Sequence, residues 1–381
     1  MRVTQSMLTN NNMKYISNSY KDLQRLSDQI TTGKKITRPS DDPVIAMKGM
    51  RYRTQVSEIK QYQRNLNEGY NWMENADTAL DSSNQILKKI RELTVQASND
   101  TYDETARKNI VDEITTLQEQ LVTLAETKVG DKYIFNGTDT ASSPMNLNQI
   151  DMEFEGFQAG LADGSINPSE YVINYQGNKY TYDSTDNMFK NKNGSSIEID
   201  GNTGEITYTY QEELPYKDGE TVAAEKKIDS GSIVISKDTA VSTNSNQVLL
   251  EVSKGISIPV NITSSNAFSL DMFGGIEAIK KMILDPDATG KEITKSLDAI
   301  DGYITDVVST QSQLGAQLNR AEMVESRLKK QEVVANQTLS ENENMDFEEA
   351  VMGYLTQQLV HNASLQVGAQ IMQRSLVDFL R

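Results

Sequence analysis

The chain has 381 residues and a formal net charge of −17, with no cysteine, one histidine (His361) and one tryptophan (Trp72). The lack of cysteine excludes disulfides, thiol catalysis and cysteine metal sites, and a single histidine excludes histidine-rich zinc sites. Aromatic residues make up only 7% of the chain, which suits long helices with narrow apolar seams better than a compact enzyme core.

Charge is spread unevenly along the chain. Residues 1–60 carry eleven Lys and Arg against five Asp and Glu, whereas residues 140–270 carry eight Lys and eighteen Asp and Glu. The acidic middle argues against nucleic acid as a partner. No apolar run approaches the ~18–20 residues of a membrane span, and residues 1–12 lack the apolar core of a cleaved signal peptide. We therefore expect no membrane partner, and any export to use a route without a cleaved signal.

The first predicted helix ends at Gly33, a typical residue after a helix C-terminus, with Lys34 and Lys35 near the negative end of the helix dipole. Apolar residues recur before it at steps of three and four, which is the spacing of one helix face. These residues are Ile16, Tyr20, Leu23, Leu26 and Ile30.

A short proline-rich segment follows, and its centre is a six-residue stretch that we name the joint hexapeptide: Arg38, Pro39, Ser40, Asp41, Asp42 and Pro43. Pro39 disfavours helix at Arg38, whereas Pro43 fits the first turn of a new helix that Ser40, Asp41 or Asp42 can cap. We predict a sharp break between two helices here. The charged side chains then either make ionic contacts within or between subunits, or simply belong to a capped helix boundary.

The second predicted helix runs from near Asp42 to Ala97, about 80 Å at ~1.5 Å per residue. Its apolar stripe is Val44, Met47, Met50, Val56, Ile59, Leu66, Tyr70, Met73, Leu80, Leu87, Ile90, Leu93 and Ala97. Residues 98–104 interrupt it. A third helix follows with apolar residues in 4-3-4-3 steps: Ile110, Ile114, Leu117, Leu121 and Leu124.

The middle of the chain changes character. Glycine, asparagine, serine and threonine separate short runs of alternating polarity, which is typical of strands and turns. Three hairpins are predicted, at residues 171–182, 196–210 and 247–263, the first turning at Gln176 to Asn178 and the second at Asp200 to Gly204.

The C-terminal part is helical again. A near-heptad rhythm predicts a coiled-coil seam, interrupted by the polar residues Gln311 and Glu325. The apolar seam residues are Ile293, Leu297, Ile300, Ile304, Val307, Leu314, Leu318 and Leu328. A last helix from about Asp346 to Phe379 carries apolar residues on more than one face, so we expect more than one neighbour to cover it.

These elements predict an α+β protein. Both chain ends form an elongated antiparallel helical bundle or coiled coil, and an inserted β-rich domain occupies the middle. We divide the chain into an N-terminal helical export and assembly segment (1–40), the N-terminal half of the bundle (41–139), the β-rich outer domain (140–270), the C-terminal half of the bundle (271–340) and a C-terminal assembly helix (341–381).

We recognise no catalytic constellation, and we expect no cofactor, no catalytic residue and no metal ligand. The phosphate-binding glycine motifs GxxxxGK[ST] and GxGxxG are both absent from the sequence. The stretch from Asp200 to Glu205 superficially suggests a calcium loop, but it lacks the ligand spacing of an EF-hand and fits a hairpin turn better. Packing or surface roles are the expected roles of His361 and Trp72. An enzyme is therefore the least favoured class of function.

Four stretches together resemble the flagellin superfamily: MRVTQSML at the N-terminus, ITTGKKITRPSDDPVIAM (30–47), KKIRELTVQASNDTYDETAR (88–107) and KYIFNGT (132–138). The joint hexapeptide and the KYIFNG turn are more similar to the hook–filament junction branch of that family. Residues 88–101 and the ending SLVDFLR would also suit a filament flagellin. The likeness covers about the first 140 and the last 100 residues.

The resemblance implies a secreted, extracellular structural protein of the bacterial flagellum, exported unfolded through the type III channel and located at the hook–filament junction. Implied partners are other copies of itself in a ring, the hook-side first hook-associated protein, flagellin and a flagellar export chaperone. The termini would pair as coiled coils on assembly. The alternatives are a filament-forming flagellin and, from another class, a secreted binding module or enzyme on a helical stalk.

Overall fold

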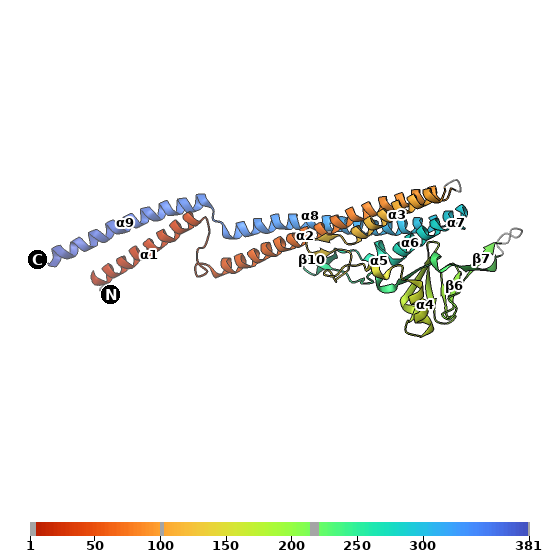
Figure 1. Cartoon of the computed structure of the whole chain (residues 1–381). Coiled ribbons are helices and arrows are strands. Elements are labelled where there is room, and N and C mark those ends of the chain that lie inside the picture. The colour runs from red at the N-terminus through yellow and green to blue at the C-terminus, as the bar shows by residue number, and fades with distance from the viewer. Residues whose placement is uncertain (1–4, 100–102, 214–220, 380–381) are drawn as a thin grey trace. The chain divides into compact units, whose positions relative to one another are not determined.

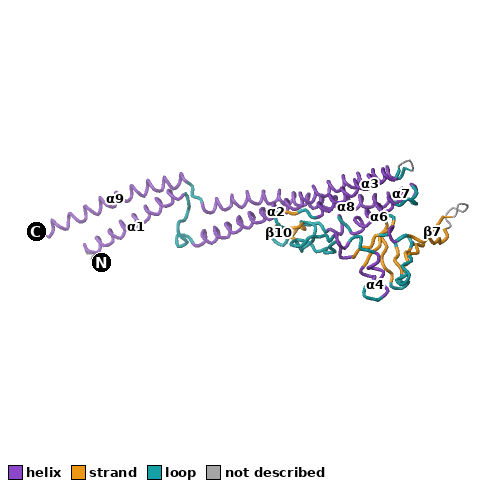
Figure 2. Tube along the Cα trace, in the orientation of Figure 1, coloured by secondary structure: helices purple, strands orange, loops and turns teal. Residues whose placement is uncertain are grey.

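The structure is a computed structural model that describes residues 5–99, 103–213 and 221–379. The chain divides into two compact units. Unit 1 comprises residues 1–64 and 325–381, and unit 2 comprises residues 65–324. Long helices at both chain ends and an antiparallel sheet in the middle give the predicted α+β class (Figures 1 and 2).

In unit 1, helices α1 (Gln5–Thr32) and α9 (Phe347–Phe379) lie side by side and antiparallel (Figure 1). Gln357 donates to the Ser19 hydroxyl at 3.3 Å, and further along the pair the rings of Tyr20 and His361 lie 6.0 Å apart. The end of α1 and the start of α9 agree with the predictions. The residue after α1 is Gly33, whose φ of 70° is the left-handed conformation that glycine adopts freely.

The face that α9 turns toward α1 consists mostly of small and polar residues, and the predicted apolar residues Ile16, Leu23, Leu26 and Ile30 of α1 are half-buried. Buried or half-buried positions recur at steps of three and four, at Ala350, Gly353, Gln357, His361, Ser364 and Gly368. Most large apolar side chains of α9 up to Gln370 are exposed, among them Phe347, Met352, Leu355, Leu359, Leu365 and Val367, whereas Val351 and Tyr354 are half-buried. On α1, Tyr20 was predicted in the contact face, but it is 62% exposed and Ser19 is buried in its place. The pairing of α1 and α9 therefore leaves a large part of their apolar surface exposed.

Helices α2 (Pro43–Ala97) and α8 (Leu297–Glu343) are antiparallel within each unit. In unit 1, Gln63 donates to Glu332 at 2.8 Å and Asn342 donates to the Ile45 carbonyl at 3.1 Å. In unit 2, Gln311 donates to Asp77 at 3.1 Å and Arg91 pairs with Asp301. Most of the predicted α2 stripe is buried, from Val56 to Ala97, but Val44, Met47 and Met50 are 55%, 64% and 58% exposed, which corrects the prediction at its start.

Besides α4 (Phe154–Ala162), described below, further helices of unit 2 are the longer α3 (Glu104–Ala125) and α6 (Leu270–Leu284) and the short α7 (Gly290–Lys295) and α5 (Ser264–Ala267). Asp103 caps α3 by accepting the Ala106 N–H, and a capping box between Thr289 and Glu292 begins α7. Lys280 of α6 reaches Gln118 of α3 at 3.0 Å, so these two helices are linked by a polar contact as well as by packing.

A seven-stranded antiparallel sheet forms the middle of unit 2, in the order β8-β7-β6-β5-β4-β3-β9. Its strands are β3 (Tyr171–Tyr175), β4 (Asn178–Asp183), β5 (Met188–Lys190), β6 (Ser196–Ile199), β7 (Ile206–Glu213), β8 (Thr221–Ile228) and β9 (Val234–Lys237). Two separate two-stranded ribbons are β1 (Lys128–Val129) with β2 (Lys132–Tyr133), and β10 (Leu249–Ser253) with β11 (Ile256–Pro259). The three predicted hairpins are confirmed as β3–β4, β6–β7 and β10–β11.

The two faces of the sheet are covered differently. Helix α4 (Phe154–Ala162) places Phe157 on one face, with its ring 5.1 Å from Tyr171 and 6.4 Å from Phe189. Helix α6 packs on the other face over β3, β4 and β9. The sequence analysis did not identify α4, because nine residues carry too little periodic signal for a helix to be recognised.

The stretch from Asp200 to Glu205, which was predicted as a hairpin turn rather than a calcium loop, is a hairpin turn. Gly204 N–H donates to the Asp200 carbonyl at 2.8 Å, and the Asp200 carboxylate accepts from Asn202 N–H and Thr203 within the same turn. Those bonds lower the pKa of Asp200, the Thr203 hydroxyl most strongly. In the described part of the chain, no three His, Cys, Asp or Glu side chains gather as a metal site would require.

Candidate assembly joint

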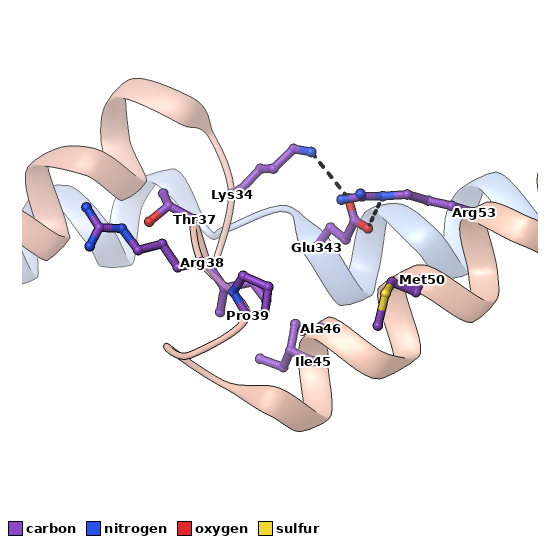
Figure 3. Close-up of a pocket in the computed structure, with 10 residues that line it drawn as sticks. Lys34, Thr37, Arg38, Pro39, Ile45, Ala46, Met50, Arg53 and Glu343 are labelled. Carbon is purple, nitrogen blue, oxygen red and sulfur yellow. Dashed lines mark hydrogen bonds and ion pairs between the residues drawn. The ribbon is translucent and has the colours of Figure 1, made fainter.

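The joint hexapeptide lies between α1 and α2, in unit 1 (Figure 3). The Asp41 N–H donates to the Arg38 carbonyl at 3.0 Å, which closes a turn with Pro39 in its second position, where the fixed φ of proline is favourable. Ser40, also within this turn, is exposed. Pro43 is the first residue of α2, where its missing N–H costs no hydrogen bond.

The two aspartates of the hexapeptide bind main-chain N–H groups. Asp41 Oδ2 accepts from Arg38 N at 2.8 Å and from Thr37 N and Oγ1 at 3.2 Å, and the bond from Arg38 N–H is the main cause that lowers the pKa of Asp41. Asp42 Oδ1 accepts from Val44 N at 2.9 Å and Ile45 N at 3.1 Å, so it caps α2. The sequence left two roles open for the charged side chains of the hexapeptide, and these contacts are those of a capped helix boundary. Ionic contacts between subunits stay a prediction.

The ionic contact at this joint is made by residues that the sequence analysis did not single out. Glu343, the last residue of α8, is 7% exposed, and its Oε1 lies 2.6 Å from Arg53 Nε while Oε2 lies 3.4 Å from Lys34 Nζ. The Arg53 hydrogen bond, more than the charge of either cation, lowers the pKa of Glu343. No local motif marks this carboxylate, since its partners lie about 300 positions away in the sequence.

Main-chain hydrogen bonds tie the two connecting segments of unit 1 together. Lys35 N–H donates to the Glu343 carbonyl at 2.7 Å, and Met345 N–H donates to the Gly33 carbonyl at 3.1 Å. Lys34 and Asn344 form an antiparallel bridge between these bonds. The α1–α2 and α8–α9 connections thus lie next to each other and are joined by these main-chain bonds, a pair of segments that we name the clasp. The clasp makes the helix break a fixed joint between two helix pairs.

A cavity of about 230 Å³ opens at this joint. Its apolar lining consists of Ile36, Pro39, Ile45, Ala46 and Met50, and the side chains of Arg38, Arg53 and Glu343 also border it (Figure 3). The hexapeptide therefore shapes a concave surface in addition to ending one helix and beginning the next.

The residues of the predicted coiled-coil seam lie on two helices, α7 and α8, and only some of them are buried. Ile293 is buried in α7, and Leu297 begins α8 after a break at Ser296. Along α8, Ile300, Val307, Leu314 and Leu328 are buried, whereas Leu297, Ile304 and Leu318 are half-buried. Tyr303, Thr310 and Val324, which the heptad analysis did not include, are buried instead, because the seam proceeds by steps of three and then four rather than four and then three.

Comparison with known families bears directly on this architecture. The family model described as "Bacterial flagellin N-terminal helical region" matches residues 3–140, and "Bacterial flagellin C-terminal helical region" matches residues 297–380. Together they cover more than half of the chain. The chain belongs to the bacterial flagellin family, a family of structural proteins of the flagellum.

Individual relatives fall into two named groups. Flagellar hook-associated protein 3 of Escherichia coli is 22% identical over 385 residues, covering 99% of this chain and 98% of the relative. Polar flagellin A of Vibrio parahaemolyticus is 24% identical over 372 residues, covering 94% and 93%. A solved structure of a flagellar hook-associated protein from Vibrio parahaemolyticus superposes with a TM-score of 0.53 at 15% identity, covering 80% of this chain and all of that one. This likeness supports the fold.

No helix in the described ranges is both long enough and apolar enough to span a membrane.

Proposed function

We propose that this chain is a structural subunit of the bacterial flagellum, an adapter that joins the hook-side hook-associated protein to the flagellin filament and has no catalytic role. The full-length similarity to flagellar hook-associated protein 3 supports this reading. So does the joint hexapeptide, whose two prolines favour the junction branch over filament flagellins.

The observation that carries the proposal is the unused apolar surface of unit 1. On α1, Ile16, Leu23, Leu26 and Ile30 are half-buried and pair with the small and polar face of α9. Met7, Met13 and Tyr15 on α1 are exposed, and so are most large apolar residues of α9 up to Gln370. Exposed apolar surface of this extent is typical of a surface that another protein covers. Assembly would remove this surface from water, and each Å² of apolar area buried contributes roughly 25 cal/mol of favourable free energy. This gain favours ordered helices in the assembled state.

The partners and segment roles follow from the same proposal. Other copies of the chain form a ring, the first hook-associated protein binds on the hook side, flagellin binds on the filament side, and an export chaperone holds the chain before assembly. Residues 1–40 and 341–381 serve export and assembly, residues 41–139 and 271–340 form the bundle, and residues 140–270 face outward from the flagellum.

Immunogold electron microscopy of flagella from the source cell tests the location. Antibody is raised against residues 140–270, and flagella from a strain lacking the gene serve as the control. We expect one cluster of gold where hook meets filament. Gold along the whole filament would instead make the chain a filament flagellin, like its relative polar flagellin A of Vibrio parahaemolyticus. Absence of gold from flagella, with the epitope accessible in purified protein, would overturn both readings.

A further inference from the structure

The cavity at the joint has the size and lining of a socket for one aromatic side chain. Its volume is about 230 Å³, and an apolar cavity of about 150 Å³ already holds a benzene molecule. Ile36, Ile45 and Met50 supply the apolar contacts that a ring requires. The clasp between the two connecting segments holds these residues in place, so the socket is formed before any partner arrives.

The border of this socket has surplus positive charge. Lys34, Arg38 and Arg53 line it together with the single carboxylate of Glu343. Lys34 and Arg53 both pair with Glu343. The Arg38 guanidinium forms no hydrogen bond or ion pair with any residue in the described ranges, and its charge contributes to the lowered pKa of the nearby Asp41 carboxyl. An occupant with an aromatic ring next to a carboxylate would therefore suit both parts of the lining.

The same unit carries a segment with those properties. Phe347, the first residue of α9, is 62% exposed and is followed by Glu348 and Glu349. Asp346 accepts the N–H groups of Glu348 at 3.0 Å and Glu349 at 3.3 Å, which fixes the first turn of α9. From Glu341 to Tyr354 the chain has five carboxylates and no Lys or Arg. Phe347 does not line the cavity of its own chain.

We propose that the Phe347 ring of one copy inserts into the joint socket of a second copy, with Glu348 and Glu349 facing its Arg38. The contact joins two different surfaces, and contacts of that kind generate rings or helical arrays when they repeat from copy to copy. This inference rests on the proposed function, because it requires copies to lie side by side in an assembly.

Photo-crosslinking in assembled flagella tests the contact. A benzophenone analogue replaces Phe347 in the full chain, flagella are isolated and irradiated, and crosslinked peptides are identified by mass spectrometry. We expect a covalent dimer of this chain whose crosslink maps to residues 36–50 of the second copy. A crosslink to a different protein, to another region of this chain or to its own socket would overturn the proposal, and so would the absence of any crosslink in flagella that contain the chain.

Matched variants separate this contact from general hydrophobicity. Phe347→Ala should reduce the amount of chain retained in isolated flagella by at least about tenfold, as expected for a central anchor. Met352→Ala, at an equally exposed position of α9, removes apolar surface outside the proposed socket contact and should reduce retention clearly less than Phe347→Ala does. Arg38→Glu should weaken retention, and combination with Glu348→Lys and Glu349→Lys should restore part of it. Equal effects of the two alanine variants would contradict the socket while leaving the immunogold result, and hence the junction role, untouched.

Discussion

Arg53 and Glu343 are 290 positions apart in the sequence, yet Arg53 Nε lies 2.6 Å from Glu343 Oε1. The carboxylate is buried at the end of α8, Arg53 reaches it from α2, and Lys34 adds a second cation from the α1–α2 connection. The Glu343 side chain therefore links three of the segments that meet at the joint: α2, α8 and the α1–α2 connection.

Glu343→Gln should loosen the clasp. The amide keeps the shape but loses the charge-assisted bond from Arg53, which we expect to cost about 1–2 kcal/mol because Arg53 itself is partly exposed. Hydrogen exchange at the Lys35 and Met345 amides should accelerate about 5- to 30-fold. Glu341→Gln, on the same turn but exposed, is the control, and equal acceleration in both variants would show that the ion pair does not hold the clasp.

The clasp should also weaken in acid. The folded-state pKa of Glu343 is below its ordinary value of 4.5, so the stabilisation is fully present above about pH 4.5 and is lost as pH falls through the lower folded pKa. Exchange at the Lys35 amide, corrected for intrinsic pH dependence, should rise in that window in the natural chain and stay level in the Glu343→Gln variant. A rise of the same size in both would assign the effect to another group.

Asp42 should be the residue of the hexapeptide on which the start of α2 depends. Asp42→Ala removes the acceptor of two N–H groups, and we expect a cost of about 1 kcal/mol, whereas Asp42→Ser should keep most of the cap. Exchange at the Val44 and Ile45 amides measures the difference. Ser40→Ala, at an exposed position of the same turn, should leave those amides unchanged, and an equal effect there would refute the capping role.

Local signals were enough to predict the break, the helix ends and three hairpins. Gly33, Pro39 and Pro43 act on their own backbone or that of a neighbour, so their effect can be read from the sequence. The joint itself could not be predicted, because Glu343 meets Lys34 and Arg53 only after the chain has doubled back. The start of the α2 stripe was misassigned for a related reason: Val44, Met47 and Met50 have apolar spacing, but their own unit provides no cover.

The seam of α8 shows a subtler limit. Steps of three and of four both keep residues on one helix face. A heptad pattern therefore predicts every seventh residue of the seam, but it does not tell whether the seam residue between them lies three or four positions after the first. Ile300, Val307 and Leu314 were identified because they lie seven apart. Tyr303 was missed because Ile304 appeared to be the better apolar candidate, although the tyrosine hydroxyl finds a buried acceptor that isoleucine could not use.

That acceptor leads to a prediction inside unit 2. The Tyr303 hydroxyl donates to the Gly177 carbonyl at 2.8 Å, at the turn between β3 and β4, and its burial raises the pKa of Tyr303. A Cβ on Gly275 of α6 would lie 1.9 Å from the Tyr303 hydroxyl. Alanine in a helix is ordinarily favoured over glycine by up to about 1 kcal/mol. At position 275 the steric clash should reverse that sign.

Urea unfolding followed by the fluorescence of Trp72, the one tryptophan and a buried residue of unit 2, measures the effect. Tyr303→Phe should lower the free energy of unfolding by about 1–3 kcal/mol, because it leaves the Gly177 carbonyl unpaired, and Gly275→Ala should lower it at least as much. Gly302→Ala, where no neighbouring atom lies within 4 Å, should stabilise the unit slightly. If both glycine variants raised the free energy of unfolding equally, the Tyr303 side chain would have to move away from Gly275 without cost. The turn between β3 and β4 would then not depend on its hydrogen bond.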